Sequence, residues 1–235
     1  MFWRGKQETE SSVVRLLAAQ LRRDIAFGIL APDTRLKIDD LRTRYGGSAH
    51  SFREALTLLA GEGLVESQAQ RGFRVASATG ADLEDIQRMR ARIEALGLEW
   101  SLAHADATWE AGLVAARHAL SRAVEAVRGD AAGEALFWDE AAAGFHAMLV
   151  SNCRSPRLIA FQERLALESR RFRLAALIEG RVDHDAEEAM RGRVLDAVLA
   201  RDVGAATAHL SQLFQPAAGA GEDRPQKPAI TGGPS

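Results

Sequence analysis

The stretch that decides the fold lies at residues 48–65 and reads SAHSFREALTLLAGEGLV. Its apolar residues Phe52, Leu56 and Leu59 recur at helical spacing, and Ser48 is a residue type that caps helix N-termini. Glycines then break the pattern. We therefore predict a helix that starts after Ser48 and a short strand soon after the glycines.

The neighbouring segments complete a small module around this helix. Upstream, the apolar spacing predicts two helices separated by a turn at Pro32. Downstream, two apolar runs flank a hairpin tip. The expected elements are helices at about 12–27, 39–44 and 49–60 and strands at 64–68 and 73–76. Three helices followed by a two-stranded wing make a winged helix-turn-helix, which we place at residues 11–77.

The rest of the chain predicts helices only, so the fold class is mainly α. We expect residues 1–10 to be a flexible end, 78–81 to be a linker and 82–214 to be an all-helical bundle. The Pro- and Gly-rich residues 215–235 should be disordered. The bundle helices are predicted near 82–104, 108–128, 133–151, 155–179, 183–201 and 203–214.

Composition excludes several classes of protein. Of the 235 residues, 47% are hydrophobic and 26% are charged, which is typical of a globular chain rather than a fibre or a disordered tail. We find no apolar run long enough to cross a membrane and no leader pattern, and Cys153 has no second cysteine to pair with. We therefore expect a cytoplasmic protein.

Charge is distributed unevenly along the chain. The net charge is −2, yet residues 11–77 carry ten Lys or Arg against seven Asp or Glu. A basic module joined to an acidic remainder favours nucleic acid as the partner of the first part.

The third helix of such a module enters the DNA major groove with its N-terminal residues toward the bases. The residues that we expect to be exposed there are Ser48, His50, Ser51 and Arg53. The alternatives are that Arg53 pairs with Glu54 or a neighbouring helix, that His50 is only solvated, and that Ser48 is first a cap.

The wing and several other arginines complete the predicted DNA surface. Arg71, beside Gly72 at the wing tip, is placed to enter the minor groove or to meet phosphate. A salt-dependent phosphate contribution is expected from Arg22, Arg23, Arg44 and Arg74. For Arg22 and Arg23, a surface role without DNA is an equal alternative.

Three motifs carry a family resemblance: Arg53-Glu-Ala-Leu56, Glu62-Gly-Leu-Val65 and Arg71-Gly-Phe-Arg-Val75. Over about residues 12–76 the chain resembles the GntR family of bacterial transcription regulators. The resemblance implies a dimer that binds a palindromic double-stranded DNA operator. Ala49 stands where the family has a DNA-contacting arginine, so the operator sequence should differ.

Two later motifs, Phe145-His146 with Ser151-Asn152 and Val194-Leu195 with His209-Leu210, resemble the helical FCD effector domain of FadR-like regulators. Many FCD domains bind a divalent metal through one Asp and three His, and the metal helps to bind a carboxylate effector. The matching positions here are Ala142, His146, Arg191 and His209, so only two of the four positions keep a metal ligand.

We therefore expect no metal cofactor. A guanidinium at Arg191 suits a carboxylate bound directly, in a pocket with His146, His209 and Arg90. The alternative is that Arg191 pairs with Glu187 or Glu188 and that the histidines are satisfied core residues.

The favoured function is a DNA-binding repressor that is controlled by a small carboxylate and is not an enzyme. One alternative is a DNA-binding regulator or architectural protein whose effector site has decayed. A distant alternative is a metal-dependent hydrolase, although the sequence shows no nucleophile–base pair for one.

Overall fold

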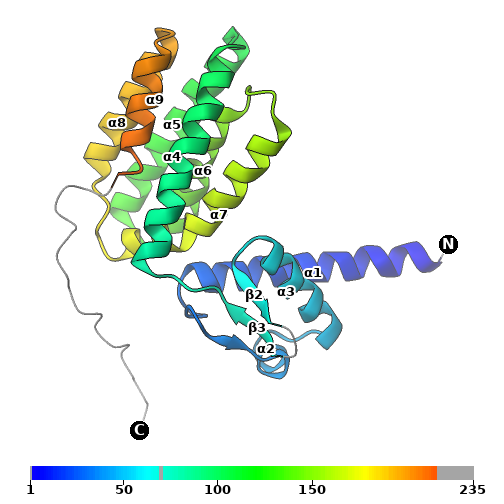
Figure 1. Cartoon of the computed structure of the whole chain (residues 1–235). Helices are drawn as coiled ribbons and strands as arrows, with labels where there is room; N and C mark the ends of the chain where they lie inside the picture. The colour runs from blue at the N-terminus through cyan, green and yellow to red at the C-terminus, as the bar shows by residue number, and fades with distance from the viewer. Residues whose placement is uncertain (1, 69–70, 216–235) are drawn as a thin grey trace.

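The computed structural model describes residues 2–68 and 71–215, with side chains described from residue 12 onward. A small winged domain lies below a bundle of long helices (Figure 1). Each unit has its own hydrophobic core. This arrangement confirms the mainly α fold that the sequence predicts.

The winged domain contains the expected helix-turn-helix. Its core is centred on Phe52, Leu56 and Leu59 of the third helix and Leu21 of the first, all fully buried. The elements are α1 Phe2–Ala26, β1 Arg35–Leu36, α2 Ile38–Tyr45, α3 Ala49–Gly61, β2 Val65–Gln68 and β3 Gly72–Val75.

Two features of this domain differ from the prediction. Helix α1 begins at Phe2, whereas we expected residues 1–10 to fray. Apolar spacing marks only the buried part of a helix, and Lys, Gln and Glu in the first turns have good helix propensity. The sheet also has three strands in the order β1-β3-β2 rather than two. Strand β1 is too short to show an alternating pattern.

The sheet register decides which side chains face the core. Leu36 pairs with Phe73, and Val65 pairs with Val75. The intervening row places Arg35 opposite Arg74, on the outward side. Ala69 and Gln70 of the expected hairpin tip lie outside the described residues.

The bundle also follows the prediction closely. Asp106, Ser155, Asp183 and Asp202 each cap a helix by accepting a hydrogen bond from a backbone N–H in its first turn. The helices are α4 Gly80–Leu102, α5 Ala107–Gly129, α6 Ala135–Val150, α7 Pro156–Ile178, α8 His184–Leu199 and α9 Val203–Gln212. Within residues 2–68 and 71–215, no helix has the length and apolarity needed to cross a membrane.

The connection between the two domains is shorter than expected. Thr79 and Asp82 form a capping box, so α4 already begins at Gly80 inside the predicted linker 78–81. At the other end, Gln215 is the last described residue, so the predicted disorder beyond it lies outside the described part of the chain.

Candidate DNA-binding surface and buried charge cluster

The N-terminus of α3 is fixed by two serines. Ser48 Oγ accepts a hydrogen bond from the backbone N–H of Ser51 at 3.0 Å, and the two hydroxyl oxygens are 2.9 Å apart. The predicted cap is therefore confirmed. Ser51 is buried, so the expectation that it is exposed beside Ser48 is wrong. The reason is its position three residues after the cap, where its side chain turns back onto Ser48.

Two side chains at the start of α3 face solvent. His50 Nε2 lies 3.1 Å from Glu54 Oε1. Glu54, the predicted alternative partner of Arg53, therefore pairs with His50 instead. Arg53 is exposed and its guanidinium contacts no acidic group among the described residues. An exposed, unpaired arginine in the first turns of a recognition helix can donate two hydrogen bonds to guanine.

The wing presents a second cation. Arg71 is exposed and follows the tip of the β2–β3 hairpin, where its backbone N–H donates to the Gln68 carbonyl at 3.0 Å. Gly72 has φ +83°, a backbone conformation that L side chains rarely adopt. The glycine therefore sets the path of the chain next to Arg71.

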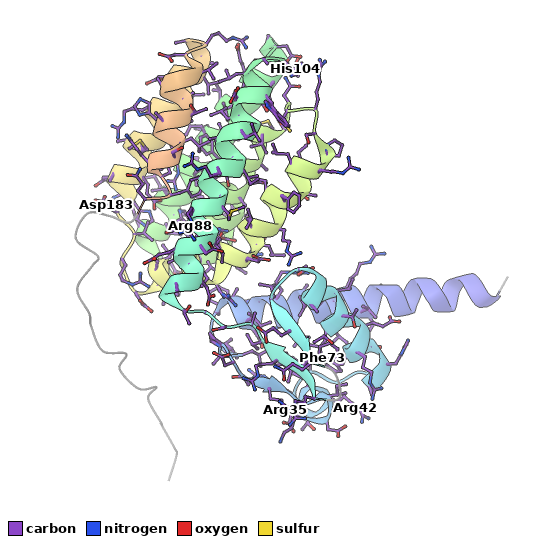
Figure 2. All side chains as sticks on the ribbon, in the orientation of Figure 1. Arg35, Arg42, Phe73, Arg88, His104 and Asp183 are labelled. Atoms are coloured by element: carbon purple, nitrogen blue, oxygen red, sulfur yellow. The ribbon has the colours of Figure 1, made fainter. Side chains whose placement is uncertain are left out.

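The outer arginines divide into exposed cations and structural pairs. Arg35 and Arg42 lie at the end of the winged domain that points away from the bundle (Figure 2). Arg23 is exposed and stacks on Phe27, with its guanidinium carbon 5.9 Å from the ring centre. Arg22 instead pairs with Glu62 through two contacts of 2.6 and 2.9 Å. This pair favours the alternative role for Arg22, as a surface contact without DNA.

A buried carboxylate supports the helix that precedes α3. Asp24 accepts a hydrogen bond from the Tyr45 hydroxyl at 2.5 Å, and burial together with Asp24 raises the pKa of Tyr45 to about 12. Arg44 is half-exposed, 3.7 Å from Asp24, with its guanidinium over the Tyr45 ring. Arg44 therefore presents its charge at the surface while anchoring the end of α2.

A buried carboxylate, Glu94, lies inside the helical bundle. Glu94 of α4 is fully buried and accepts hydrogen bonds from Arg90 Nε at 2.9 Å and from His146 Nδ1 at 2.6 Å. Burial alone would raise the pKa of Glu94, but Arg90 and His146 outweigh it and bring the pKa to about 2. Burial lowers the pKa of His146, although Glu94 opposes this shift. The Phe214 ring covers the Arg90 guanidinium at 4.7 Å.

A second buried carboxylate lies beside this group. Asp139 of α6 is paired with Arg173 at 2.6 Å and Arg170 at 2.7 Å, both from α7. The Ser169 hydroxyl joins the two groups, because it accepts hydrogen bonds from both Arg90 and Arg173. We call this set the buried charge cluster; it comprises Arg90, Glu94, Asp139, His146, Ser169, Arg170 and Arg173.

Sequence reasoning found only part of the cluster. It named Arg90 and His146, which the structure brings together through Glu94. It missed Asp139, Arg170 and Arg173 as members of one site. The available signal was their spacing, since Asp139 and His146 are seven residues apart on α6 and therefore share a face with Ala142.

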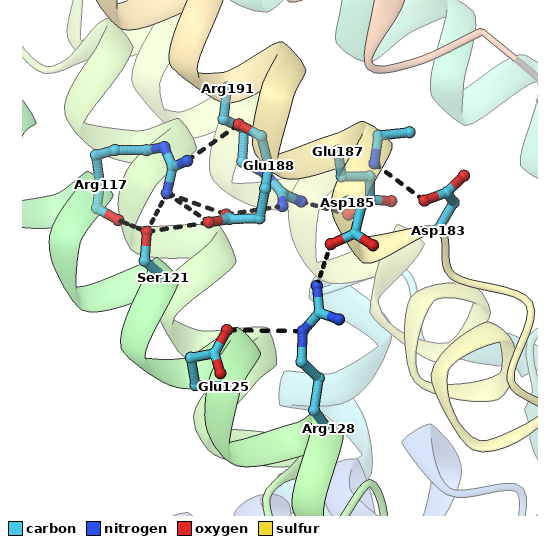
Figure 3. Close-up of polar contacts among 10 residues, drawn as sticks. Arg117, Ser121, Glu125, Arg128, Asp183, Asp185, Glu187, Glu188 and Arg191 are labelled. Atoms are coloured by element: carbon cyan, nitrogen blue, oxygen red, sulfur yellow. Dashed lines mark hydrogen bonds and ion pairs between the residues drawn. The ribbon is translucent and has the colours of Figure 1, made fainter.

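Arg191 lies at the edge of this region, on α8. Its guanidinium is buried and pairs with Glu187 at 2.6 Å and Glu188 at 3.8 Å, within a network that reaches Arg117 of α5 (Figure 3). The pairing of Arg191 with Glu187 and Glu188, which the sequence analysis gave as the alternative, is therefore present. Arg191 is also near enough to help lower the pKa of His146. His209 of α9 contributes a buried Nδ1 atom with no hydrogen-bond partner among the described residues.

The residues at the FCD metal positions do not fit a metal ion. Ala142 offers a methyl group and Arg191 a cation, and neither is a metal ligand. His146 uses Nδ1 to contact Glu94 and has the Arg90 guanidinium close by. Among the described side chains, no three His, Cys, Asp or Glu residues gather as a metal site.

A capped recognition helix, an arginine-bearing wing and a helical bundle with a buried charge cluster define a DNA-binding regulator. Residues 14–75 match the model for bacterial regulatory proteins of the gntR family, and residues 85–215 match the FCD domain. The chain therefore belongs to the GntR family and carries an FCD domain.

Curated relatives agree with this membership. The chain is 36% identical over 203 residues to the HTH-type transcriptional repressor GlaR of Escherichia coli K12, which covers 83% of this chain and 87% of the relative. It is also 36% identical over 194 residues to BphR of Paraburkholderia xenovorans LB400, an uncharacterized HTH-type transcriptional regulator, covering 81% and 78%. The family and these relatives are regulators, so the hydrolase alternative is set aside.

Solved structures share the fold. McbR/YncC of E. coli superimposes with a TM-score of 0.65 at 18% identity, over 86% of this chain and 93% of the other. A GntR regulator from Rhodococcus sp. RHA1 gives a TM-score of 0.65 at 23% identity, over 87% and 94%. At these identities the likeness supports the architecture of both domains.

Proposed function

We propose that this regulator is a repressor that binds a palindromic operator as a homodimer and releases it when a small carboxylate binds in the bundle without a metal ion. The name of the E. coli relative, a transcriptional repressor, supports the sign of regulation. Arg53, Arg71 and His50 are the proposed base or groove contacts. Ser48, Gly72 and Arg44 position them or meet phosphate.

The observation that carries the effector proposal is an excess of guanidinium groups inside the bundle. Arg90, Arg170 and Arg173 share two buried carboxylates, those of Glu94 and Asp139. The third carboxylate that contacts them, Glu140, is exposed and lies 3.8 Å from Arg170. A planar guanidinium binds a carboxylate through two parallel hydrogen bonds, so a surplus arginine favours an anionic ligand.

Buried polar atoms without partners elsewhere in the bundle support the same ligand chemistry. Arg191 Nε and His209 Nδ1 are buried without hydrogen-bond partners among the described residues, as are both polar atoms of Gln162. A buried polar atom without a partner costs about 1–3 kcal/mol, which a bound carboxylate would recover in part. The proposed effector contacts are Arg90, His146, Arg191 and His209.

A homodimer fits the surface of α4. Met89, Leu96 and Trp100 are 44%, 38% and 39% exposed and recur on one side of the helix. A second copy of the chain would cover this stripe. The dimer would also bring two winged domains to the two half-sites of an operator. One winged domain alone makes only a small interface with DNA, so two are needed for specific binding.

A ligand screen tests the proposal. The melting temperature of the purified protein is measured in EDTA with acetate, pyruvate, succinate or citrate added. Release of bound DNA is then measured with the same four carboxylates. We expect at least one carboxylate to raise the Tm and release DNA, and Arg191→Ala to abolish both effects. Arg181→Ala, which removes an exposed arginine from the turn before α8, is the control.

Two outcomes would overturn parts of the proposal. Tight stoichiometric Zn²⁺ or Ni²⁺ in the purified protein would contradict a metal-free site. Indifference to every carboxylate would favour a decayed effector site, the second candidate function. That candidate has its own support, because Glu187 and Glu188 already pair with Arg191.

A further inference from the structure

The winged domain and the bundle exchange apolar contacts across their boundary. Leu167 of α7 packs against the core of the winged domain. In return, Ala26 and Phe27, at the end of α1, pack against the core of the bundle. Helix α7 also lies against α1 along this boundary (Figure 1). The two domains are therefore docked through α7 and are not joined by the connecting chain alone.

Arg171 fixes the connection between the domains. Its guanidinium donates one hydrogen bond to the Ala76 carbonyl at 3.0 Å and another to the Ser77 carbonyl. These two carbonyls directly follow β3 and precede the cap of α4. One planar group thus holds two consecutive peptide units, which limits rotation of the chain between the wing and the bundle.

Glu168 brings α7 against the turn that follows α3. Gly63 in this turn has φ +77°, and a Cβ atom placed there would be 2.3 Å from Glu168 Oε1. The end of the Glu168 side chain therefore lies where a Cβ atom at position 63 would stand, so a larger residue there would require this carboxylate to move. Helix α7 and the end of the recognition helix cannot shift independently without opening this contact.

The same turns of α7 carry part of the buried charge cluster on another face. Ser169 accepts a hydrogen bond from Arg90, while Arg170 and Arg173 pair with Asp139. Residues 167, 168 and 171 share one side of a helix, and residues 169, 170 and 173 face another. A rearrangement of the cluster would therefore move the helix that holds the winged domain.

We propose that residues 167–173 of α7 couple the buried charge cluster to the recognition helix, with Arg171 as the positioning residue. This coupling through α7 deepens the proposed function. It rests on that function only for the identity of the effector that disturbs the cluster. Arg171 acts through the Ala76 and Ser77 carbonyls.

A double-mutant cycle on DNA affinity tests this route without any effector. Asp139→Asn disturbs the cluster, and Arg171→Ala removes the contact with the connection. Kd is measured for a DNA sequence selected by the wild-type protein. We expect Asp139→Asn to change Kd by about fivefold or more in the wild-type background, and by less than about twofold when Arg171 is alanine. Equal fold changes in both backgrounds, or none in either, would overturn the proposal.

Hydrogen exchange gives a readout that needs no DNA. Asp139→Asn should speed deuterium uptake in residues 72–79 of the wild type, whereas Arg171→Ala should already show fast uptake that Asp139→Asn does not change. If Asp139→Asn leaves deuterium uptake in residues 72–79 unchanged, the coupling is contradicted, whether or not the wild type binds a specific DNA sequence. Failure of the wild type to bind any specific DNA would instead refute the proposed function.

Two further variants separate positioning from folding. Arg157→Ala removes an exposed arginine from the first turn of the same helix and should leave both readouts unchanged. Arg171→Lys keeps the charge but has one donor nitrogen in place of the two that bond the carbonyls, so it should restore part of the coupling. If circular dichroism shows that Arg171→Ala does not fold, Arg171→Lys takes its place in the cycle. Coupling in Arg171→Lys as strong as in the wild type would then overturn the role of the contact with the two carbonyls.

Discussion

Glu94→Gln is the substitution whose consequence the structure defines most closely. The carboxylate is fully buried and receives hydrogen bonds from Arg90 at 2.8 and 2.9 Å and from His146 at 2.6 Å. Glutamine has nearly the same shape but no charge. Arg90, which is 5% exposed, would lose the one carboxylate that pairs with it directly among the described residues, while the Ser169 hydroxyl and the Phe214 ring stay in contact.

The expected cost follows from leaving a buried cation without its anion. Breaking a buried ion pair by removing one partner costs about 3–5 kcal/mol. The glutamine oxygen still accepts one hydrogen bond, so we expect the lower end, about 3 kcal/mol. For a chain of this size that corresponds to a fall in Tm of roughly 6–12 °C.

Urea unfolding followed by circular dichroism measures the effect, with thermal melting as the second assay. Glu163→Gln, which changes an exposed glutamate on α7, is the matched control and should stay within about 0.5 kcal/mol of the wild type. A loss below about 1 kcal/mol in Glu94→Gln would show that Arg90 does not depend on this carboxylate, and the description of the cluster as a buried ion pair would be refuted.

Three further predictions concern stability. Tyr45→Phe should lose about 1–3 kcal/mol in urea unfolding, because Asp24 is buried and loses a 2.5 Å hydrogen bond; a neutral result would contradict that role. Gly63→Ala should lose more than about 1 kcal/mol, because φ +77° strains any L side chain and the Glu168 carboxylate must also move; wild-type stability would refute that strain. Burial, helped by Arg90 and Arg191 and opposed by Glu94, holds the pKa of His146 below 6.5, so below that pH the unfolded chain binds a proton more readily than the native state does. Stability should therefore fall as the pH decreases from 6.5, by up to about 1.4 kcal/mol per pH unit, and His146→Asn should flatten that slope; an unchanged slope would exclude His146 as its source.

The sequence predicted the elements of the winged domain because local rules specify them. Ser48 is a cap residue, the apolar spacing of Phe52 and Leu56 marks the buried face of α3, and Gly72 permits the wing geometry. Strand β1 escaped prediction, because a two-residue edge strand forms only when β3 is already in place.

The candidate site was harder to predict, because its pairings join residues distant in the chain. Arg22 was expected to be a possible phosphate contact, yet Glu62 lies 40 residues away in sequence and pairs with it. Asp139 is placed beside Arg170 and Arg173 only by the packing of α6 on α7. Helical spacing specified which face each residue occupies, but it carried no information about which faces meet.

The most direct test of DNA reading is a titration of the wild type and Arg53→Ala against a selected sequence and an unrelated one. Arg88→Ala, on the exposed side of α4, is the control for an arginine outside the DNA surface. We expect Arg53→Ala to weaken binding to the selected sequence by about 1–3 kcal/mol, with a much smaller change on unrelated DNA. If Arg53→Ala binds the selected sequence as tightly as the wild type, α3 does not read DNA through this residue, and the assigned recognition surface is wrong.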